Sequence, residues 1–435
     1  MLAVSGARVL VVSALVAVAV ALGVVSPAEA APRPVATKAS SAPGSLTGYG
    51  FDTCSAPPQE LMDAWWQSSP YAAVGVYIGG SNRLCQDQPE LSAGWVRTQQ
   101  KRGWRVLSLY VGPQASCSGY ADRMPADRVA AESLGRSEAN AAVAIARGLG
   151  IGKGSTLYYD LEDFDIGPDD CRQAALGFLS GWAKELEAQG YDSGVYSNIA
   201  AAITALDFAN FASPGSYQMP DDIWFAWSNG QADTGTADWV RTDAWDDHAR
   251  IHQYRTDVTA VYGGYALSVD ENWLDVGQGS VPPKDKPLCK GVDVDLERYP
   301  TLRAGSRGAA VEVAQCLLRR NRLSAAPITG TYTAKTAAAV RKLQRKTGQK
   351  ATGTLTRATW TALLAKGSTP VLKVGLTGTS VERLQRALTA AGRRTSITGV
   401  YTAKTAKAVR KVQKGAGLPG TGVVTRDLWK VLQGR

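Results

Sequence analysis

The stretch TLYYDLED, residues 156–163, joins an apolar run to three carboxylates. Side chains of a strand alternate between its two faces, so Tyr158, Asp160 and Glu162 share one face of this segment. Leu157, Tyr159 and Leu161 then share the other face and would pack beneath covering helices. Asp163 falls in the loop that follows. The stretch therefore predicts a buried strand whose carboxyl end presents two acids on one side.

Seven further segments have the same strand-like character, and helical patterns separate the early ones. The helical patterns cover residues 91–102, 129–149 and 172–189. Eight strands with helical crossovers within about 230 residues predict an α/β fold, a (β/α)8 TIM-like barrel over residues 48–277. A doubly wound open sheet is the alternative, but no glycine-rich phosphate loop supports it. The expected strands are Tyr49–Asp52, Ala73–Ile78, Arg105–Val111, Thr156–Asp160, Ser193–Tyr196, Ile223–Trp227, Arg250–Gln253 and Leu267–Asp270.

Acids stand at the ends of several of these strands. Asp52 ends the first strand, Asp160 and Glu162 end the fourth, and Asp270 ends the eighth. Catalytic groups of such barrels gather at the carboxyl ends of the strands. Two carboxylates in one pocket do not ionise independently, so one keeps its proton near neutral pH and can act as a general acid. Glycosidic bond cleavage needs such an acid.

Aromatic side chains near the same strand ends suggest a sugar-binding cleft, because aromatic faces stack on sugar rings. Tyrosine and tryptophan are also common core residues with one polar handle, so a packing role is the alternative for each of them. The predicted substrate-binding residues are Tyr77, Tyr110, Tyr196, Trp227 and Gln253.

Short motifs in this region resemble known families. The motifs occur in the order GFD (50–52), DLE (160–162), GVYSN (194–198), IWFAW (223–227), HQY (252–254) and VDEN (269–272). In this order they resemble the glycoside hydrolase family 25 lysozymes. A closer resemblance is to a secreted actinobacterial family of glycoside-hydrolase-like barrels, carried by GFDTCSAP (50–57), YIGGSNRLC (77–85) and YVG (110–112).

The resemblance implies a muramidase-like hydrolase that cuts peptidoglycan glycan strands. It implies Glu162 as the general acid and Asp160 as the group that orients or stabilises the reacting N-acetyl group or oxocarbenium ion. Asp52 and Asp270 would complete an acidic mouth. The alternative is a barrel that holds wall glycan without cutting it, because a fold does not by itself carry a function.

Other hydrolytic chemistries have little support in the sequence. The chain has two histidines, His248 and His252, and neither belongs to an H-E-x-x-H motif. That is too few for a three-histidine zinc site, so we expect no metal and no cofactor. His252 is expected to be a satisfied strand-end residue.

Six cysteines in an exported chain are expected to form disulfides. Cys289 and Cys316 lie apart from the rest, so we expect them to pair with each other. The remaining four allow three pairings. Neighbouring loops favour Cys54–Cys85 and Cys117–Cys171.

Residues 1–30 have the features of a secretory signal peptide. An apolar run from Val9 to Val25 follows one arginine, and Ala28-Glu29-Ala30 supplies a small-x-small cleavage pattern. We expect cleavage after Ala30 and export, with a retained membrane anchor as the alternative. Residues 31–47 are rich in alanine, proline and serine and predict a flexible leader.

A tandem repeat follows a linker at residues 278–300. ITGTYTAKTAAAVRKLQ (328–344) matches ITGVYTAKTAKAVRKVQ (397–413), which predicts two small three-helix domains at 301–367 and 370–435. Thr333 and Thr402 are expected N-caps. The pattern resembles the peptidoglycan-binding type 1 domain family, which implies attachment to the wall. A helical protein-interaction module is the alternative.

Charge is divided between the two parts of the chain. Residues 290–435 hold 28 of the 48 lysines and arginines but 6 of the 38 acids. A basic region suggests a polyanionic partner. We expect this partner to be peptidoglycan and its associated anionic wall polymers, with a monomeric, secreted, wall-associated protein. Few aromatics interleave with the basic residues, so we expect no nucleic-acid partner, and no membrane partner after cleavage.

Overall fold

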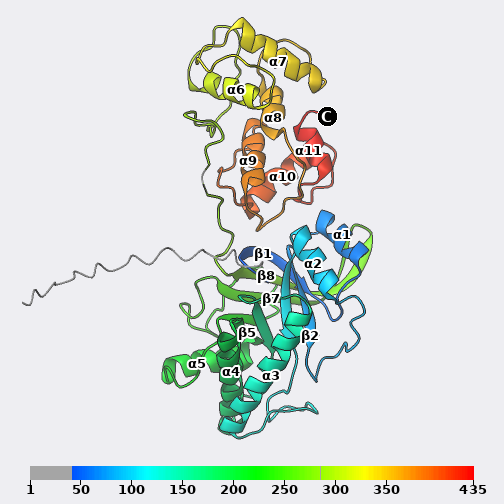
Figure 1. Cartoon of the computed structure of the whole chain (residues 1–435), viewed down its shortest axis with the longest axis vertical. Coiled ribbons are helices and arrows are strands. Elements are labelled where there is room, and N and C mark those ends of the chain that lie inside the picture. The colour runs from blue at the N-terminus through cyan, green and yellow to red at the C-terminus, as the bar shows by residue number, and fades with distance from the viewer. Residues whose placement is uncertain (1–41, 285) are drawn as a thin grey trace, which may run out of the picture. The chain divides into compact units, whose positions relative to one another are not determined.

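The computed structural model describes residues 42–284 and 286–435, so the expected signal peptide and most of the expected leader lie outside the described residues. Eight strands close into one barrel in sequence order, as predicted (Figure 1). β1 begins at Leu46, so the last two residues of the predicted leader belong to the sheet. The strands are β1 (Leu46–Asp52), β2 (Ala73–Gly79), β3 (Arg105–Tyr110), β4 (Thr156–Asp160), β5 (Asp192–Asn198), β6 (Asp222–Ala226), β7 (Ala249–Tyr262) and β8 (Tyr265–Val276).

Helices follow each of the first five strands. The three helices predicted from periodicity are present as α2, α3 and α4, and α1 and α5 add to them. Figure 1 shows α3 and α4 side by side, and their close approach depends on small residues. A Cβ on Gly135 of α3 would lie 2.1 Å from the Phe178 carbonyl oxygen of α4. The bounds are α1 (Gln59–Ser68), α2 (Ala93–Arg102), α3 (Arg128–Gly148), α4 (Asp169–Gln189), the π-turn η1 (Ile199–Ile203) and α5 (Thr204–Ala212).

The last two strands depart from a uniform (β/α)8 pattern. β7 and β8 form a hairpin, and β8 runs antiparallel to both β7 and β1. Gly263 and Gly264 make the two-residue turn with φ of 60° and 87°, the left-handed conformation that hairpin turns of this length require. The sequence prediction that Asp270 lies at the carboxyl end of an eighth strand is therefore wrong. β8 continues to Val276, and Asp270 lies in its first half.

Alternation along β4 sorts its side chains as expected. Tyr158 belongs to the apolar cluster inside the barrel, with Leu107, Leu109 and Trp224. Tyr159 and Leu161 belong to the outer cluster beneath the helices. The interior is therefore filled by side chains below the level of Asp160, which places that acid at the mouth.

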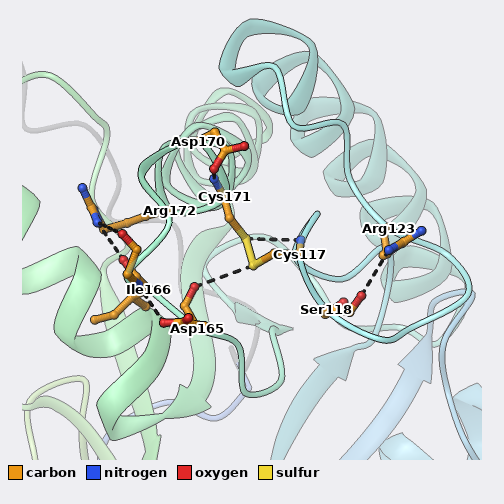
Figure 2. Close-up of a disulfide and its surroundings, with 9 residues drawn as sticks. Cys117, Ser118, Arg123, Asp165, Ile166, Asp170, Cys171 and Arg172 are labelled. Carbon is orange, nitrogen blue, oxygen red and sulfur yellow. Dashed lines mark hydrogen bonds between the residues drawn. A yellow bond between two sulfur atoms is a disulfide. The ribbon is translucent and has the colours of Figure 1, made fainter.

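Three disulfides form, with the pairings Cys54–Cys85, Cys117–Cys171 and Cys289–Cys316 that the sequence favoured. Figure 2 shows the second, which joins the β3–α3 loop to the first turn of α4. The Cys117 amide donates to the Cys171 Sγ at 3.3 Å. The disulfide holds the loop that follows β3 against the start of the helix that follows β4, the neighbouring strand of the barrel.

The C-terminal region contains the two predicted three-helix domains. Thr333 and Thr402 cap α7 and α10 by accepting hydrogen bonds from the Thr336 and Thr405 amides at 3.5 Å and 3.4 Å. No helix among the described residues has the length and apolarity needed to cross a bilayer. The helices are α6 (Ala309–Arg320), α7 (Ala334–Lys346) and α8 (Arg357–Ala365), then α9 (Thr379–Ala390), α10 (Ala403–Gly415) and α11 (Arg426–Leu432).

A buried glutamine holds a Thr-Gly loop at four places in these domains. In the second domain, Gln385 Oε1 accepts from the Thr398 and Gly399 amides at 2.9 Å and 3.0 Å, and its Nε2 donates to the Val400 carbonyl at 2.9 Å. The side-chain amide thus satisfies backbone groups that a buried loop would otherwise leave unpaired. The four glutamines are Gln315, Gln344, Gln385 and Gln413.

We predict that Gln385→Leu will lower the free energy of unfolding of the second domain by roughly 3 kcal/mol, because the buried Gly399 amide and the partly buried Thr398 amide lose their acceptor. Hydrogen exchange should then be at least tenfold faster at Thr398 and Gly399. Lys407→Leu, at an exposed position in the same domain, is the control and should leave these exchange rates unchanged. Unchanged exchange in Gln385→Leu would contradict the assigned role.

Candidate active site

Asp52, the last residue of β1, is a buried carboxyl with 2% of its surface exposed. Its Oδ2 accepts hydrogen bonds from Asn272 Nδ2 at 2.6 Å and from Gln253 Nε2 at 3.2 Å. Burial, reinforced by the charge of Asp270, raises the pKa of Asp52 to about 7, although the two amides oppose this rise. Asp52 is therefore a group whose charge changes near neutral pH.

Two further side chains fix the orientation of the amides that contact Asp52. Trp224 Nε1 donates to Asn272 Oδ1 at 2.8 Å, and the Tyr196 hydroxyl donates to Gln253 Oε1 at 2.9 Å. With each amide oxygen occupied, each amide nitrogen is directed at the Asp52 carboxyl. Tyr196 and Gln253, both predicted to contact substrate, thus take part in holding a carboxyl.

Asp270 lies level with Asp52 because the two residues are direct partners across the antiparallel β1–β8 pairing. Its Oδ1 accepts from the Asp257 amide at 2.7 Å, and its Oδ2 accepts from Gln253 Nε2 at 3.3 Å. Burial is the main cause that raises the pKa of Asp270, and the charge of Asp257 adds to it. The shared Gln253 amide links the two carboxyls into one network.

The β4 acids form the second half of the site. Asp160 is 1% exposed, and its Oδ1 has no hydrogen-bond partner among the described residues. Burial, then the charges of Glu162 and Asp52, raise the pKa of Asp160 well above its usual range. Burial, then the charges of Asp163 and Asp270, also raise the pKa of Glu162. Both β4 carboxyls therefore keep a proton to higher pH than a free carboxyl does.

Gln114, from the β3–α3 loop, fixes the backbone on both sides of Leu161. Its Oε1 accepts from the Glu162 amide at 2.8 Å, and its Nε2 donates to the Asp160 carbonyl at 2.9 Å. The side chain is buried, so these bonds are shielded from water. Gln114 thereby sets the positions of both acids relative to each other, although it is distant from them in the sequence.

Two tyrosines stand among the acids. Tyr77, on β2, lines the same cleft as the carboxyls, and Tyr196, on β5, packs against the interior cluster. Burial, then the charges of Asp52, Asp160 and Glu162, raise the pKa of both phenols well above the usual value. Both hydroxyls are therefore neutral hydrogen-bond donors at physiological pH.

These groups open on one cleft of about 640 Å³. Asp52, Asp160, Glu162 and Asp270 all line it, as does Tyr77, so five of the residues singled out in the sequence come together. A cleft of this size accommodates a small ligand or part of a polymer.

Two loops also line the cleft, and no residue in them was predicted to bind substrate. The β2–α2 loop contributes Asn82, Arg83 and Leu84, and Leu84 is 90% exposed. The β3–α3 loop contributes Tyr120. A leucine and a tyrosine exposed beside acids suit a ligand with both apolar and polar groups.

Two predicted cleft residues lie elsewhere. The Tyr110 hydroxyl donates to Glu138 of α3 at 2.7 Å, and its ring packs against Trp182 beneath the helices. Trp227 stacks on His252 with ring centroids 6.0 Å apart and packs against the outer cluster. Both residues were predicted to line the cleft because they are near strand ends. Leu109 points into the barrel, so alternation along β3 points Tyr110 outward.

Two network residues could have been found from the sequence by the same rule of alternation. Asn272 lies two positions after Asp270, so the two share a face of β8. Trp224 lies on the inward face of β6, where it contacts Tyr158 and Tyr196. Gln114 and Tyr120 carry no such signal, because loop positions have no fixed period.

His252 is fully buried, and its ring nitrogens contact the backbone carbonyls of Asp233 and Trp227 at 2.8 Å and 2.9 Å. The prediction that the ring is satisfied is confirmed, but the predicted position at a strand end is wrong, because β7 continues from Ala249 to Tyr262. Within residues 42–284 and 286–435, no group of three or more histidines, cysteines or acids is arranged to hold a metal ion.

Two protein families match the chain. Residues 63–274 match the family described as Rv2525c-like, glycoside hydrolase-like domain. Residues 307–363 and 377–432 each match a peptidoglycan binding domain family. No curated protein matches the chain.

Solved structures similar to this chain cover about half of it. An uncharacterized protein of B. stearothermophilus is 21% identical, with 52% of this chain and 95% of that chain covered and a TM-score of 0.35. The Tat-secreted protein Rv2525c of Mycobacterium tuberculosis, in complex with L-tartrate, is 17% identical, with coverages of 53% and 98% and a TM-score of 0.37. The modular autolysin LytC of Streptococcus pneumoniae is 13% identical, with coverages of 52% and 46% and a TM-score of 0.35.

The acids, the closed barrel and the tandem helical repeats agree with the family matches. The chain consists of an Rv2525c-like, glycoside hydrolase-like domain followed by two peptidoglycan-binding domains.

Proposed function

We propose that the barrel is a glycoside hydrolase that cuts the glycan strands of peptidoglycan with muramidase-like specificity. The observation that carries this proposal is the meeting of Asp160 and Glu162 with Asp52 and Asp270 on one open cleft, each with a raised pKa. Glycosidic cleavage requires a carboxylic acid that holds a proton near neutral pH and a nearby group that stabilises the oxocarbenium-like transition state.

Glu162 is the general acid in this mechanism. It is more exposed than Asp160, so it can reach the glycosidic oxygen and donate its proton as the bond to the leaving sugar breaks. Asp160 offers a buried oxygen without a partner among the described residues, which suits a hydrogen bond to the acetamido group of the sugar. In their ionised forms, Asp52 and Asp270 add negative potential, which stabilises the positive charge developing on the sugar ring.

The peptidoglycan-binding domains associate the chain with the cell wall and supply peptidoglycan as a partner. We propose further that the protein is exported, acts as a monomer and also contacts the anionic polymers of the wall. Three disulfides support export, because such bonds form and persist in oxidising compartments.

Glu162→Gln should lower the release of reducing sugar ends from purified walls by about 10²–10⁴-fold, because the amide cannot donate the proton. Glu138→Gln is a matched control, since Glu138 lies on α3, does not line the cleft and accepts a hydrogen bond from Tyr110. If the wild-type protein releases no reducing ends from several wall types, the barrel binds glycan without cutting it and the hydrolase proposal fails.

Stability should depend on pH through Asp52. The pKa of Asp52 rises from 3.8 to about 7 on folding, so the folded state holds this proton more tightly. The contribution to stability is therefore complete below pH 3.8 and is lost as pH rises through about 7. Between pH 4 and pH 8, the unfolding free energy of the wild type should fall by on the order of 3 kcal/mol more than that of Asp52→Asn.

Urea unfolding at pH 4, 6 and 8 measures this effect without any assay of activity. The change in unfolding free energy with pH is the readout, because the substitution also alters the hydrogen bonds to Asn272 and Gln253. Asp238→Asn, at an exposed position that does not line the cleft, should keep the wild-type dependence on pH. The same dependence in wild type and Asp52→Asn would contradict the assignment.

Gln114→Leu should lower kcat by about 10²-fold with a smaller change in KM, because it releases the backbone that positions Asp160 and Glu162. Gln173→Leu, whose exposed side chain binds Asp169 on α4, is the control and should leave kcat unchanged. A kcat for Gln114→Leu equal to that of the wild type would show that these bonds do not position the acids.

A further inference from the structure

The second helix of each C-terminal domain is cationic along its whole exposed face. α7 and α10 each carry five lysines and arginines, and neither helix contains an acid. All ten side chains are exposed. They are Lys335, Arg341, Lys342, Arg345 and Lys346 on α7, and Lys404, Lys407, Arg410, Lys411 and Lys414 on α10.

The ten cations of α7 and α10 form no ion pairs within the described part of the chain, whereas some cations on other helices do. Among the described residues, none of the ten forms an ion pair with a carboxylate. In the barrel, Arg136 and Lys184 both pair with Glu132. In the second C-terminal domain itself, Arg386 of α9 pairs with Glu382. Unpaired cations also occur on other helices that the structure describes, as Arg319 and Arg320 of α6 show, but α7 and α10 each gather five of them on a helix without an acid.

The arrangement works against the stability of each helix. Arg341 and Arg345 are four residues apart, as are Lys342 and Lys346, so like charges face each other along α7. Lys335 lies in the first turn, where a positive charge opposes the helix dipole. A bound polyanion would relieve both effects.

The same positions are charged in both repeats. Lys335, Arg341, Lys342 and Arg345 of α7 correspond to Lys404, Arg410, Lys411 and Lys414 of α10. Lys335, Lys342 and Lys346 form a stripe that extends over about 16 Å of helix. A stripe of this length contacts several successive charges of an extended polymer, whereas a single peptide carboxylate would occupy one of its positions.

Two other polyanionic partners fit the surface poorly. A membrane-bound helix inserts an apolar face, but Ala339, Val340 and Leu343 of α7 are buried in the core of their own domain. Single-stranded nucleic acid is held by exposed aromatic rings, but Trp360 and Trp429 are fully buried. The exposed face offers charge alone, which suits a flexible chain of phosphodiesters.

We propose that the exposed faces of α7 and α10 bind a linear phosphodiester polymer of the cell wall, in addition to the peptidoglycan that the two domains bind. This inference rests on the proposed contact with anionic wall polymers and assigns that contact to two helix faces. The C-terminal region then has two separate ligands. The two domains bind peptidoglycan, and the basic faces of α7 and α10 bind the phosphodiester polymer.

The experiment measures binding of the full chain to insoluble walls before and after hydrofluoric acid has removed their phosphodiester polymers. This treatment leaves peptide carboxylates in place, so it separates the two sources of negative charge. The test variant combines Lys335→Gln, Lys342→Gln, Lys404→Gln and Lys411→Gln. Glutamine is a good helix former, so these exposed substitutions preserve the fold, and circular dichroism verifies this. The control variant removes four positive charges from the barrel surface through Arg97→Gln, Lys101→Gln, Arg147→Gln and Lys153→Gln.

At low salt, the wild type and the control should bind native walls at least tenfold more tightly than treated walls, and high salt should abolish the difference. The test variant should bind native and treated walls equally. A wild type without preference for native walls, or a test variant that keeps the preference, would overturn the inference. Binding to treated walls measures attachment to peptidoglycan alone. A loss of that attachment can therefore be distinguished from a loss of the preference for native walls.

Discussion

The antiparallel seam between β1 and β8 is the constraint on which the active-site geometry depends. Seven parallel strands bring their carboxyl ends to one mouth, and β8 closes the barrel by running the opposite way. The direct pairing of Asp52 with Asp270 places a carboxyl from each strand at the same level. Asn272 then reaches Asp52 from the same face of β8. The strand pairing that closes the barrel therefore also brings Asp52 and Asp270 together.

The network around Asp52 also explains how several acids coexist at one mouth. Amide groups that could have turned either way are fixed by Trp224 and Tyr196, so their nitrogens face the carboxyl. These donors favour the charged form, while burial and the neighbouring acids favour the protonated form. The balance leaves the pKa of Asp52 near neutrality. For Asp160, burial and the charges of Glu162 and Asp52 raise the pKa well above its usual range.

Much of the fold followed from local signals in the sequence. The eight strands, three of the helices and the inward face of β4 all follow from periodicity, because burial on one side imposes a period on the side chains. The antiparallel direction of β8 was missed although Gly263 and Gly264 mark a hairpin turn. The segments on either side of these glycines have alternating apolar residues, such as Val258 and Ala260 before the turn and Leu267 and Val269 after it, so the hairpin could have been predicted from the sequence.

The candidate site was predictable where strands supply the residues and unpredictable where loops do. Asp52, Asp160, Glu162 and Asp270 were found because a strand end fixes its neighbours in space. Tyr110 was wrongly predicted to line the cleft, because the prediction considered its distance from the strand end and not the face of β3 on which it lies. Gln114 joins the site through the path of a loop, which depends on tertiary contacts that the local sequence does not encode.

The glutamine clamps have a consequence for how the C-terminal region is built. Gln315 and Gln344 hold equivalent Thr-Gly loops within one domain, and Gln385 and Gln413 do the same in the next. The smallest self-similar unit is therefore a helix with the loop that it holds, and this unit occurs on α6, α7, α9 and α10. Each three-helix domain contains two such units followed by one further helix, so the region is repetitive at two nested levels.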